Sequence, residues 1–171
     1  IRGYNPTYAG HVGQIKRAAK AISDAKKPIL YVGGGAIIAN ASEEVAELAV
    51  QNEIPVTMTL LGLGAFPSTH ELSLGMLGMH GTAYANHAIM DSDLIISIGA
   101  RFDDRVTGKL EAFAPHAKVI HIDIDPASVS KNVEVDIPIV GDAKLILKQL
   151  NKCVKKPDTK DWINTITGWK K

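Results

Sequence analysis

The fold of this chain follows from Pro28-Ile29-Leu30-Tyr31-Val32-Gly33-Gly34-Gly35, a short apolar run that breaks into three glycines. A continuous apolar run of this length predicts a strand buried on both faces, as strands of parallel sheets are. The glycines predict a tight turn at its end. Before the run, Val12, Ile15, Ala19 and Ile22 recur at helical spacing with Lys and Arg between them, which predicts an amphipathic helix.

The alternation of helix and strand continues along the chain. Further strands are expected at Ile54–Met58, Asp93–Ile98, Lys118–Asp123 and Ile137–Val140, and further helices near Ser42, from Thr82 to Ile89 and from Asp142 to Leu150. The segment Leu60–Gly81 shows no sustained period, so we expect an irregular connection there. Parallel strands need crossover helices. The predicted class is therefore α/β: a doubly wound, Rossmann-like, mostly parallel six-stranded sheet with helices on both faces.

Composition excludes several classes of protein. The 171 residues, 46% hydrophobic and 22% charged, suit one globular domain. A net charge of +1 argues against a nucleic-acid partner, and no apolar stretch is long enough to span a membrane. The single cysteine, Cys153, excludes an internal disulfide and favours a reducing compartment. We expect residues 1–151 to form the domain and residues 152–171 to form a linker, with Trp162, Ile163 and Ile166 opening a next element.

Candidate site residues follow the strands, because ligands of doubly wound sheets bind beyond the carboxyl ends of the strands. The turn Gly33–Gly35 would let a pyrophosphate approach the backbone, or it is only a strand-to-helix turn. The spacing is not G-x-G-x-x-G, and Thr57–Leu61 offers no acidic residue for a ribose, which argues against an ordinary NAD dehydrogenase.

The segment Gly99–Arg105 places two arginines and two aspartates at a strand end. Guanidinium groups bind phosphate or carboxylate in bidentate fashion. The alternative is a salt-bridged turn with no ligand. A metal is not expected, because neighbouring aspartates in an extended segment point apart and no His or Glu stands at ligand spacing.

Two acidic strand ends are further candidates. In His121–Pro126 the alternation directs Asp123 and Asp125 to the same side, where a carboxylate can accept hydrogen bonds from a ribose or ribityl chain. Asp125 alternatively caps a turn at Pro126. Asp142 repeats the arrangement one strand later, or it is the N-cap of the following helix.

The run Leu74–Thr82 mixes methionine, glycine and histidine. Methionine side chains adapt to flat aromatic ligands, but Met76 and Met79 could equally fill a core, with His80 a hydrogen-bonded polar residue. No Ser/His/Asp or Cys/His set can be assembled, so no covalent nucleophile is expected.

These motifs occur together in one known family. The chain closely resembles, over nearly its whole length, the central domain of the catalytic large subunit of acetohydroxyacid synthase (acetolactate synthase), a thiamine-diphosphate enzyme. The resemblance rests on Tyr4–Pro6 through Ile15, Gly33–Gly35, Thr59–Pro67, Leu77–Gly81, Gly99–Val106 and His121–Asp125.

The resemblance implies FAD held in an extended pose across the strand ends, with thiamine diphosphate and Mg²⁺ bound by domains absent here. It implies a cytoplasmic, bacterial-type enzyme, a homodimer or tetramer with a regulatory small subunit, that condenses pyruvate with pyruvate or 2-oxobutyrate in branched-chain amino-acid biosynthesis. This fragment would be inactive alone and would contain neither catalytic residues nor metal ligands. The alternative is a non-catalytic domain that binds ADP or NAD, or a scaffold.

The resemblance also implies which residues contact the cofactor, and it places Met79 and Arg105 at the substrate channel as well. The implied FAD contacts are Gly33, Gly34, Gly35, Thr59, Leu60, Leu61, Leu77, Gly78, Met79, His80, Gly99, Ala100, Arg101, Asp103, Arg105, Asp123, Ile124, Asp142 and Ala143.

Overall fold

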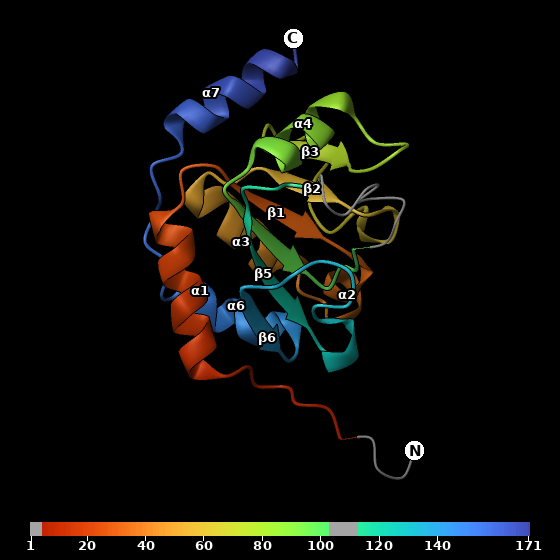
Figure 1. Ribbon diagram of the computed structural model, residues 1–171, viewed down its shortest axis with the longest axis vertical. Helices are drawn as coiled ribbons and strands as arrows, with labels where there is room; N and C mark the ends of the chain where they lie inside the picture. Colours follow the sequence, from red (N-terminus) through yellow and green to blue (C-terminus); the bar gives the residue numbers. More distant parts are fainter. Residues whose placement is uncertain (1–4, 103–112) are drawn as a thin grey trace.

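A six-stranded sheet in which every neighbouring pair of strands is parallel forms the centre of the molecule (Figure 1). The computed structural model of the chain describes residues 5–102 and 113–171. The strands are β1 (Pro28–Val32), β2 (Val56–Met58), β3 (Ser73–Met76), β4 (Leu94–Ile98), β5 (Lys118–Asp123) and β6 (Ile137–Val140). Their order, β3-β2-β1-β4-β5-β6, is that of a doubly wound fold whose switch point lies between β1 and β4. The predicted fold class is confirmed.

Helices cover both faces of the sheet. One face packs against α1 (Val12–Asp24), α3 (Ser42–Asn52) and α6 (Ala143–Asn151), and the other packs against α4 (Ala83–Asp91) and α7 (Lys160–Trp169). A short helix α2 (Gly34–Ile38) follows β1, and 3₁₀ turns η1 (Leu60–Gly62) and η3 (Pro126–Ser128) follow β2 and β5.

The two faces follow from strand alternation. In β1, Leu30 and Val32 pack toward α1, α3 and α6, whereas Ile29 and Tyr31 point to the opposite face. All five residues of β1 are buried, as the apolar run predicts. In α1, three of the four residues predicted at helical spacing, Ile15, Ala19 and Ile22, are buried against the sheet, whereas Val12 at the start of the helix is exposed. Burial of each large aliphatic side chain contributes about 1.5–3 kcal/mol.

The expectation of an irregular connection over Leu60–Gly81 was wrong in part, because this segment contains η1 and the edge strand β3. The strand is only four residues long, includes Gly75 and pairs with β2 in a shifted register. A short edge strand with an internal glycine carries too little periodicity to be recognised. The predicted cap of α4 is confirmed, since the Thr82 hydroxyl accepts a hydrogen bond from the amide of Ala85 (3.2 Å).

Residues 160–169 form a helix that packs on the sheet. The indole N–H of Trp162 donates to the carbonyl of Pro28 (3.0 Å), and Trp162 and Ile166 are buried in the same core as α4. Lys170 Nζ donates to the carbonyls of Glu71 (2.6 Å) and Ser73 (2.8 Å), and the partial desolvation of this ammonium group lowers the pKa of Lys170. The division into a domain 1–151 and a linker 152–171 stays a prediction. Within the described ranges, no helix has the length and apolar character needed to cross a membrane.

Candidate functional site

The carboxyl ends of the six parallel strands form one edge of the molecule, toward which the strand arrows in Figure 1 point. The structure brings the described members of the predicted site to this edge: Gly33–Gly35 after β1, Thr59–Leu61 after β2, Leu77–His80 after β3, Gly99–Arg101 after β4, Asp123 and Ile124 at the end of β5, and Asp142 and Ala143 after β6. Asp103 and Arg105 lie outside the described residues.

At the switch point, the glycine turn after β1 lies in direct contact with the turn after β4. A Cβ atom on Gly33 would lie 2.5 Å from the Cα of Ala100, and one on Gly35 would lie 2.7 Å from the Cα of Gly99. The Gly35 amide also donates to the carbonyl of Gly99 (3.0 Å). Gly33 and Gly35 therefore allow two backbone segments to approach, as a structural turn requires. Whether a pyrophosphate also approaches here stays a prediction.

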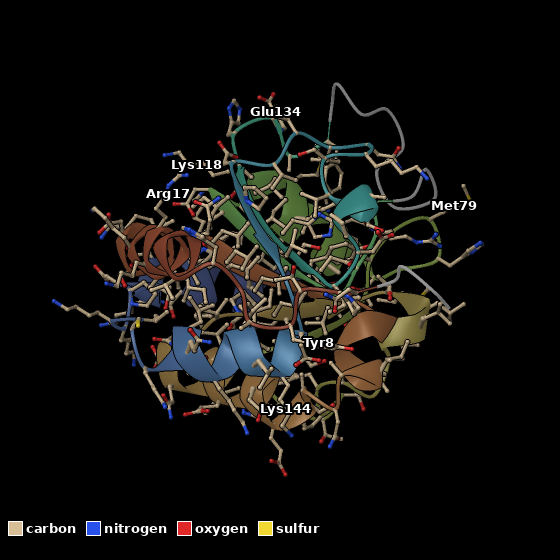
Figure 2. All side chains as sticks on the ribbon, turned by 90° about the horizontal axis from the view of Figure 1, so that it is seen from below. Tyr8, Arg17, Met79, Lys118, Glu134 and Lys144 are labelled. Carbon is tan, nitrogen blue, oxygen red and sulfur yellow. The ribbon has the colours of Figure 1, made fainter. Side chains whose placement is uncertain are left out.

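Apolar side chains are exposed on the turns after β2 and β3. Leu60 and Leu61 are 70% and 76% exposed, on a 3₁₀ turn whose N-cap Thr59 accepts from the Gly62 amide (3.0 Å). Met79 is 78% exposed and lies at the periphery of the view in Figure 2. Core filling is therefore excluded for Met79. Exposed apolar groups at a ligand edge are typical of a surface that another molecule covers.

Asn86 of α4 fixes the peptide of Gly78. The Gly78 amide donates to Asn86 Oδ1 (3.1 Å), and Asn86 Nδ2 donates to the Gly78 carbonyl (3.1 Å). Gly78 has φ +101°, a conformation open to glycine but strained for other residues. Leu77 is buried, whereas Met79 and His80 project from the turn. Sequence reasoning missed Asn86, whose only signal was a polar residue in the first turns of a short helix.

A row of buried polar side chains supports the turn after β4. Tyr31, Ser97 and His121 occupy neighbouring register positions on three adjacent strands. The Tyr31 hydroxyl donates to the Arg101 carbonyl (3.2 Å), and both Ser97 Oγ (3.3 Å) and His121 Nε2 (2.9 Å) donate to the Ala100 carbonyl. Sequence reasoning missed all three as parts of this site.

The flanking carbonyls of the same turn also have donors. The Gly99 carbonyl accepts from the amide of Gly35, and the Phe102 carbonyl accepts from Asn132 Nδ2 (2.7 Å). Gly99 has φ +56°, which turns the chain sharply as it leaves β4. All four consecutive carbonyls from Gly99 to Phe102 are thus hydrogen-bonded, while the side chain of Arg101 is exposed at the edge.

The surroundings of His121 favour its neutral form. Because a carbonyl only accepts, Nε2 carries the ring proton, and the buried Nδ1 has no hydrogen-bond partner. The Phe102 ring stands edge-on to the imidazole, with 5.6 Å between ring centroids. Burial lowers the pKa of His121, and Asp123, whose Oδ2 lies 3.8 Å from Nε2, only partly offsets this.

Two of the three acidic candidates cap local structure. Asp125 accepts from the amide of Ala127 (2.9 Å) at the start of η3, and Asp142 Oδ1 accepts from the Leu145 amide (3.0 Å) at the start of α6. These are the capping alternatives left open by the sequence. Asp123 is half-buried and accepts from the amide of Asp125 (2.9 Å).

A small pocket lies beside Arg101. It is lined by Arg101, Phe102, Ser128, Ser130, Lys131, Asn132 and Val133. Two cationic side chains and several hydroxyl and amide groups suit an anionic ligand. In residues 5–102 and 113–171, no three His, Cys, Asp or Glu side chains gather as a metal site would require.

This geometry defines a doubly wound α/β domain with a candidate ligand site at the carboxyl edge of its sheet. Residues 15–150 match the family model described as thiamine pyrophosphate enzyme, central domain, and the chain belongs to this family. The resemblance found in the sequence motifs is thereby confirmed.

Several curated relatives are similar over almost the whole chain. The acetolactate synthase large subunit of Haemophilus influenzae is 56% identical over 99% of this chain and 31% of its own length. A probable acetolactate synthase large subunit of Methanocaldococcus jannaschii is 52% identical over 100% of this chain and 29% of its own length. The acetolactate synthase isozyme 3 large subunit of Escherichia coli K12 is 48% identical over 99% of this chain. The chain spans about a third of the length of these relatives.

Proposed function

We propose that this chain is the central domain of an acetolactate synthase large subunit and that its carboxyl edge binds FAD. The observation that carries the proposal is the exposure of Leu60, Leu61 and Met79 on the same edge as the exposed Arg101, in a chain 56% identical to such a subunit. A flavin nucleotide combines a flat, largely apolar ring with a diphosphate, so it needs both kinds of contact.

We infer that the described residues would hold FAD in an extended pose. The exposed leucines and Met79 would lie against the ring, and Arg101 would bind the diphosphate through its guanidinium group. Asp123, at the end of β5, would accept hydrogen bonds from ribose or ribityl hydroxyl groups. The glycine turns, His80 and the Asp142–Ala143 turn would border the cofactor. Asp103 and Arg105 are proposed as further contacts, and Arg105 and Met79 as the border of a substrate channel.

The proposed reaction releases the carboxylate of one pyruvate as CO2 and joins the remaining two-carbon unit to the 2-oxo carbon of a second pyruvate or of 2-oxobutyrate. Thiamine diphosphate, bound with Mg²⁺ by other domains, supplies the carbanion chemistry. No substrate is oxidised overall, so we assign FAD in this domain a structural role. We further propose a cytoplasmic enzyme, a homodimer or tetramer with a regulatory small subunit, and no activity in the isolated domain.

A domain replacement tests the proposal. The chain is substituted for the matching 31% of the Haemophilus influenzae large subunit, and acetolactate formation and FAD content are measured. We expect flavin absorbance after gel filtration and activity close to that of the parent. Arg101→Ala in the same protein should release flavin. A folded hybrid without flavin but with tight ADP or NAD binding would instead support the nucleotide-binding alternative, and no nucleotide binding at all would support a scaffold.

A further inference from the structure

The buried polar side chains of Tyr31, Ser97 and His121 all donate hydrogen bonds to the same turn, which packing alone does not require. On the same register line, Thr57 donates to the carbonyl of Gly75 in the neighbouring strand region (3.1 Å). Tyr31, Ser97 and His121 instead all direct their donors at one turn, the one that carries Arg101. These side chains are essentially inaccessible to solvent, so their donors would be costly to leave without acceptors.

We propose that Tyr31, Ser97 and His121 are positioning residues, which fix the direction of Arg101 toward the ligand by holding the carbonyls of Ala100 and Arg101. The identity of the ligand rests on the proposed function, whereas the positioning itself does not. Because these donors come from three strands of a rigid sheet, the turn has one orientation relative to the strand ends. The exposed guanidinium is then presented from a fixed backbone.

Aromatic packing against the strands also supports this turn. The Phe102 ring is buried and contacts Tyr31, with 5.4 Å between ring centroids, and His121, at 5.6 Å. Phe102, the residue after Arg101, therefore packs against Tyr31, which donates to the Arg101 carbonyl, and against His121, which donates to the Ala100 carbonyl. Arg101 stands between two buried neighbours, Ala100 and Phe102, and it is the exposed residue of the three.

The first test needs no ligand. Amide hydrogen exchange over residues 99–102 is measured for the chain carrying Tyr31→Phe, with Ser92→Ala as matched control. Ser92 is also buried and donates a hydroxyl hydrogen bond to a carbonyl, that of Ile89 (2.7 Å), but at the opposite end of the strands. We expect exchange over 99–102 to be about tenfold faster in Tyr31→Phe and unchanged in Ser92→Ala. Equal exchange in the two variants would overturn the proposal.

The second test is a double-mutant cycle on FAD affinity in the domain-replaced subunit. Tyr31→Phe should weaken FAD about five- to tenfold when Arg101 is present and have no further effect when it is combined with Arg101→Ala. Independent, multiplying losses would show that Tyr31 does not act through Arg101. If the parent hybrid binds no flavin, the proposed function fails, and the exchange measurement alone decides the positioning.

A conservative variant separates positioning from packing. His121→Gln keeps a donor near the place of Nε2, whereas His121→Leu keeps apolar volume without a donor. We expect His121→Gln to retain slow exchange over 99–102 and FAD affinity within about twofold, and His121→Leu to lose both by about tenfold. Equal behaviour of the two variants would show that the hydrogen bond to Ala100 is not what holds the turn.

Discussion

Gly33 and Ala100 lie so close that a methyl group on Gly33 would stand 2.5 Å from the Cα of Ala100. The contact joins the turns after β1 and β4, the two strands that flank the switch point of the sheet. Both turns belong to the candidate site, so the packing of one sets the position of the other.

Gly33→Ala should therefore destabilise the fold by about 3 kcal/mol, since the backbone around the new methyl group cannot give way as a flexible side chain would. The φ of Gly33 is −111°, which any residue adopts, so the loss of stability comes from the steric clash and not from backbone strain. The change in the free energy of unfolding is measured by urea titration with tryptophan fluorescence as the signal. Gly168→Ala is the control, because its Cβ would meet no atom within 4 Å. It should be neutral or slightly stabilising, and similar losses in both variants would refute the packing argument.

Acid should destabilise this protein partly through His121. Its pKa is lowered in the fold, so the unfolded chain binds more protons than the folded chain below the unfolded pKa of about 6.5. The free energy of unfolding should fall as the pH drops from about 6.5 toward the lowered folded pKa, and it should be insensitive to this group above that window. Measurements at pH 7.5 and 5.5 should show a larger loss in the wild type than in His121→Gln. The opposite order would mean that the folded protein holds His121 protonated.

Trp162→Ala should cost about 3–5 kcal/mol, because it empties a buried site and removes the indole donor to Pro28. Thermal unfolding measures the loss. Trp169→Ala is the control on the same helix, and it should cost much less because Trp169 is exposed.

A chain ending at Asn151 should also unfold more easily than the full chain. If it were equally stable, residues 152–171 would be only a linker.

Arg101→Ala should weaken FAD binding in the domain-replaced subunit by about 10- to 100-fold with little change in stability, since it removes a charge-assisted contact from an exposed position. Asp142→Ala should instead lower stability and leave FAD binding almost unchanged. It removes the N-cap of α6 and should cost about 1 kcal/mol of stability with little effect on flavin. Flavin fluorescence titration and urea unfolding measure the two quantities, and equal losses of affinity would contradict the ranking.

Local signals were sufficient for most of the fold. The bounds of β1, β5 and β6 agree with the sequence prediction, because β-forming apolar residues occupy most of each strand and turn-forming residues follow closely. The edge strand β3 was missed because four residues with a glycine show no period. The helix α7 was only suggested by Trp162, Ile163 and Ile166, since a helix held by distant contacts with β1 and α4 has no local sign of where it docks.

From the sequence, only the location of the candidate site, at the carboxyl edge of the sheet, could be predicted. Parallel topology is enough to bring the residues after each strand together, and the structure places all the described ones there. The row Tyr31, Ser97 and His121 was not predictable, because its members are separated by 24 to 90 positions and become neighbours only through strand register. Likewise, only the folded packing shows that Gly33 and Gly35 admit the backbone of the turn after β4.

The docking of α7 determines where a reporter can be attached. Lys170 is bound to the carbonyls of Glu71 and Ser73, beside the beginning of β3, whereas the Tyr8 carbonyl accepts from the amide of Asp142, beyond the end of β6. The two ends of the described chain accordingly emerge from opposite sides of the sheet (Figure 1). A fluorophore or immobilisation tag after Lys171 would therefore lie on the side of β3, away from the turn at Asp142, and leave the candidate FAD edge accessible.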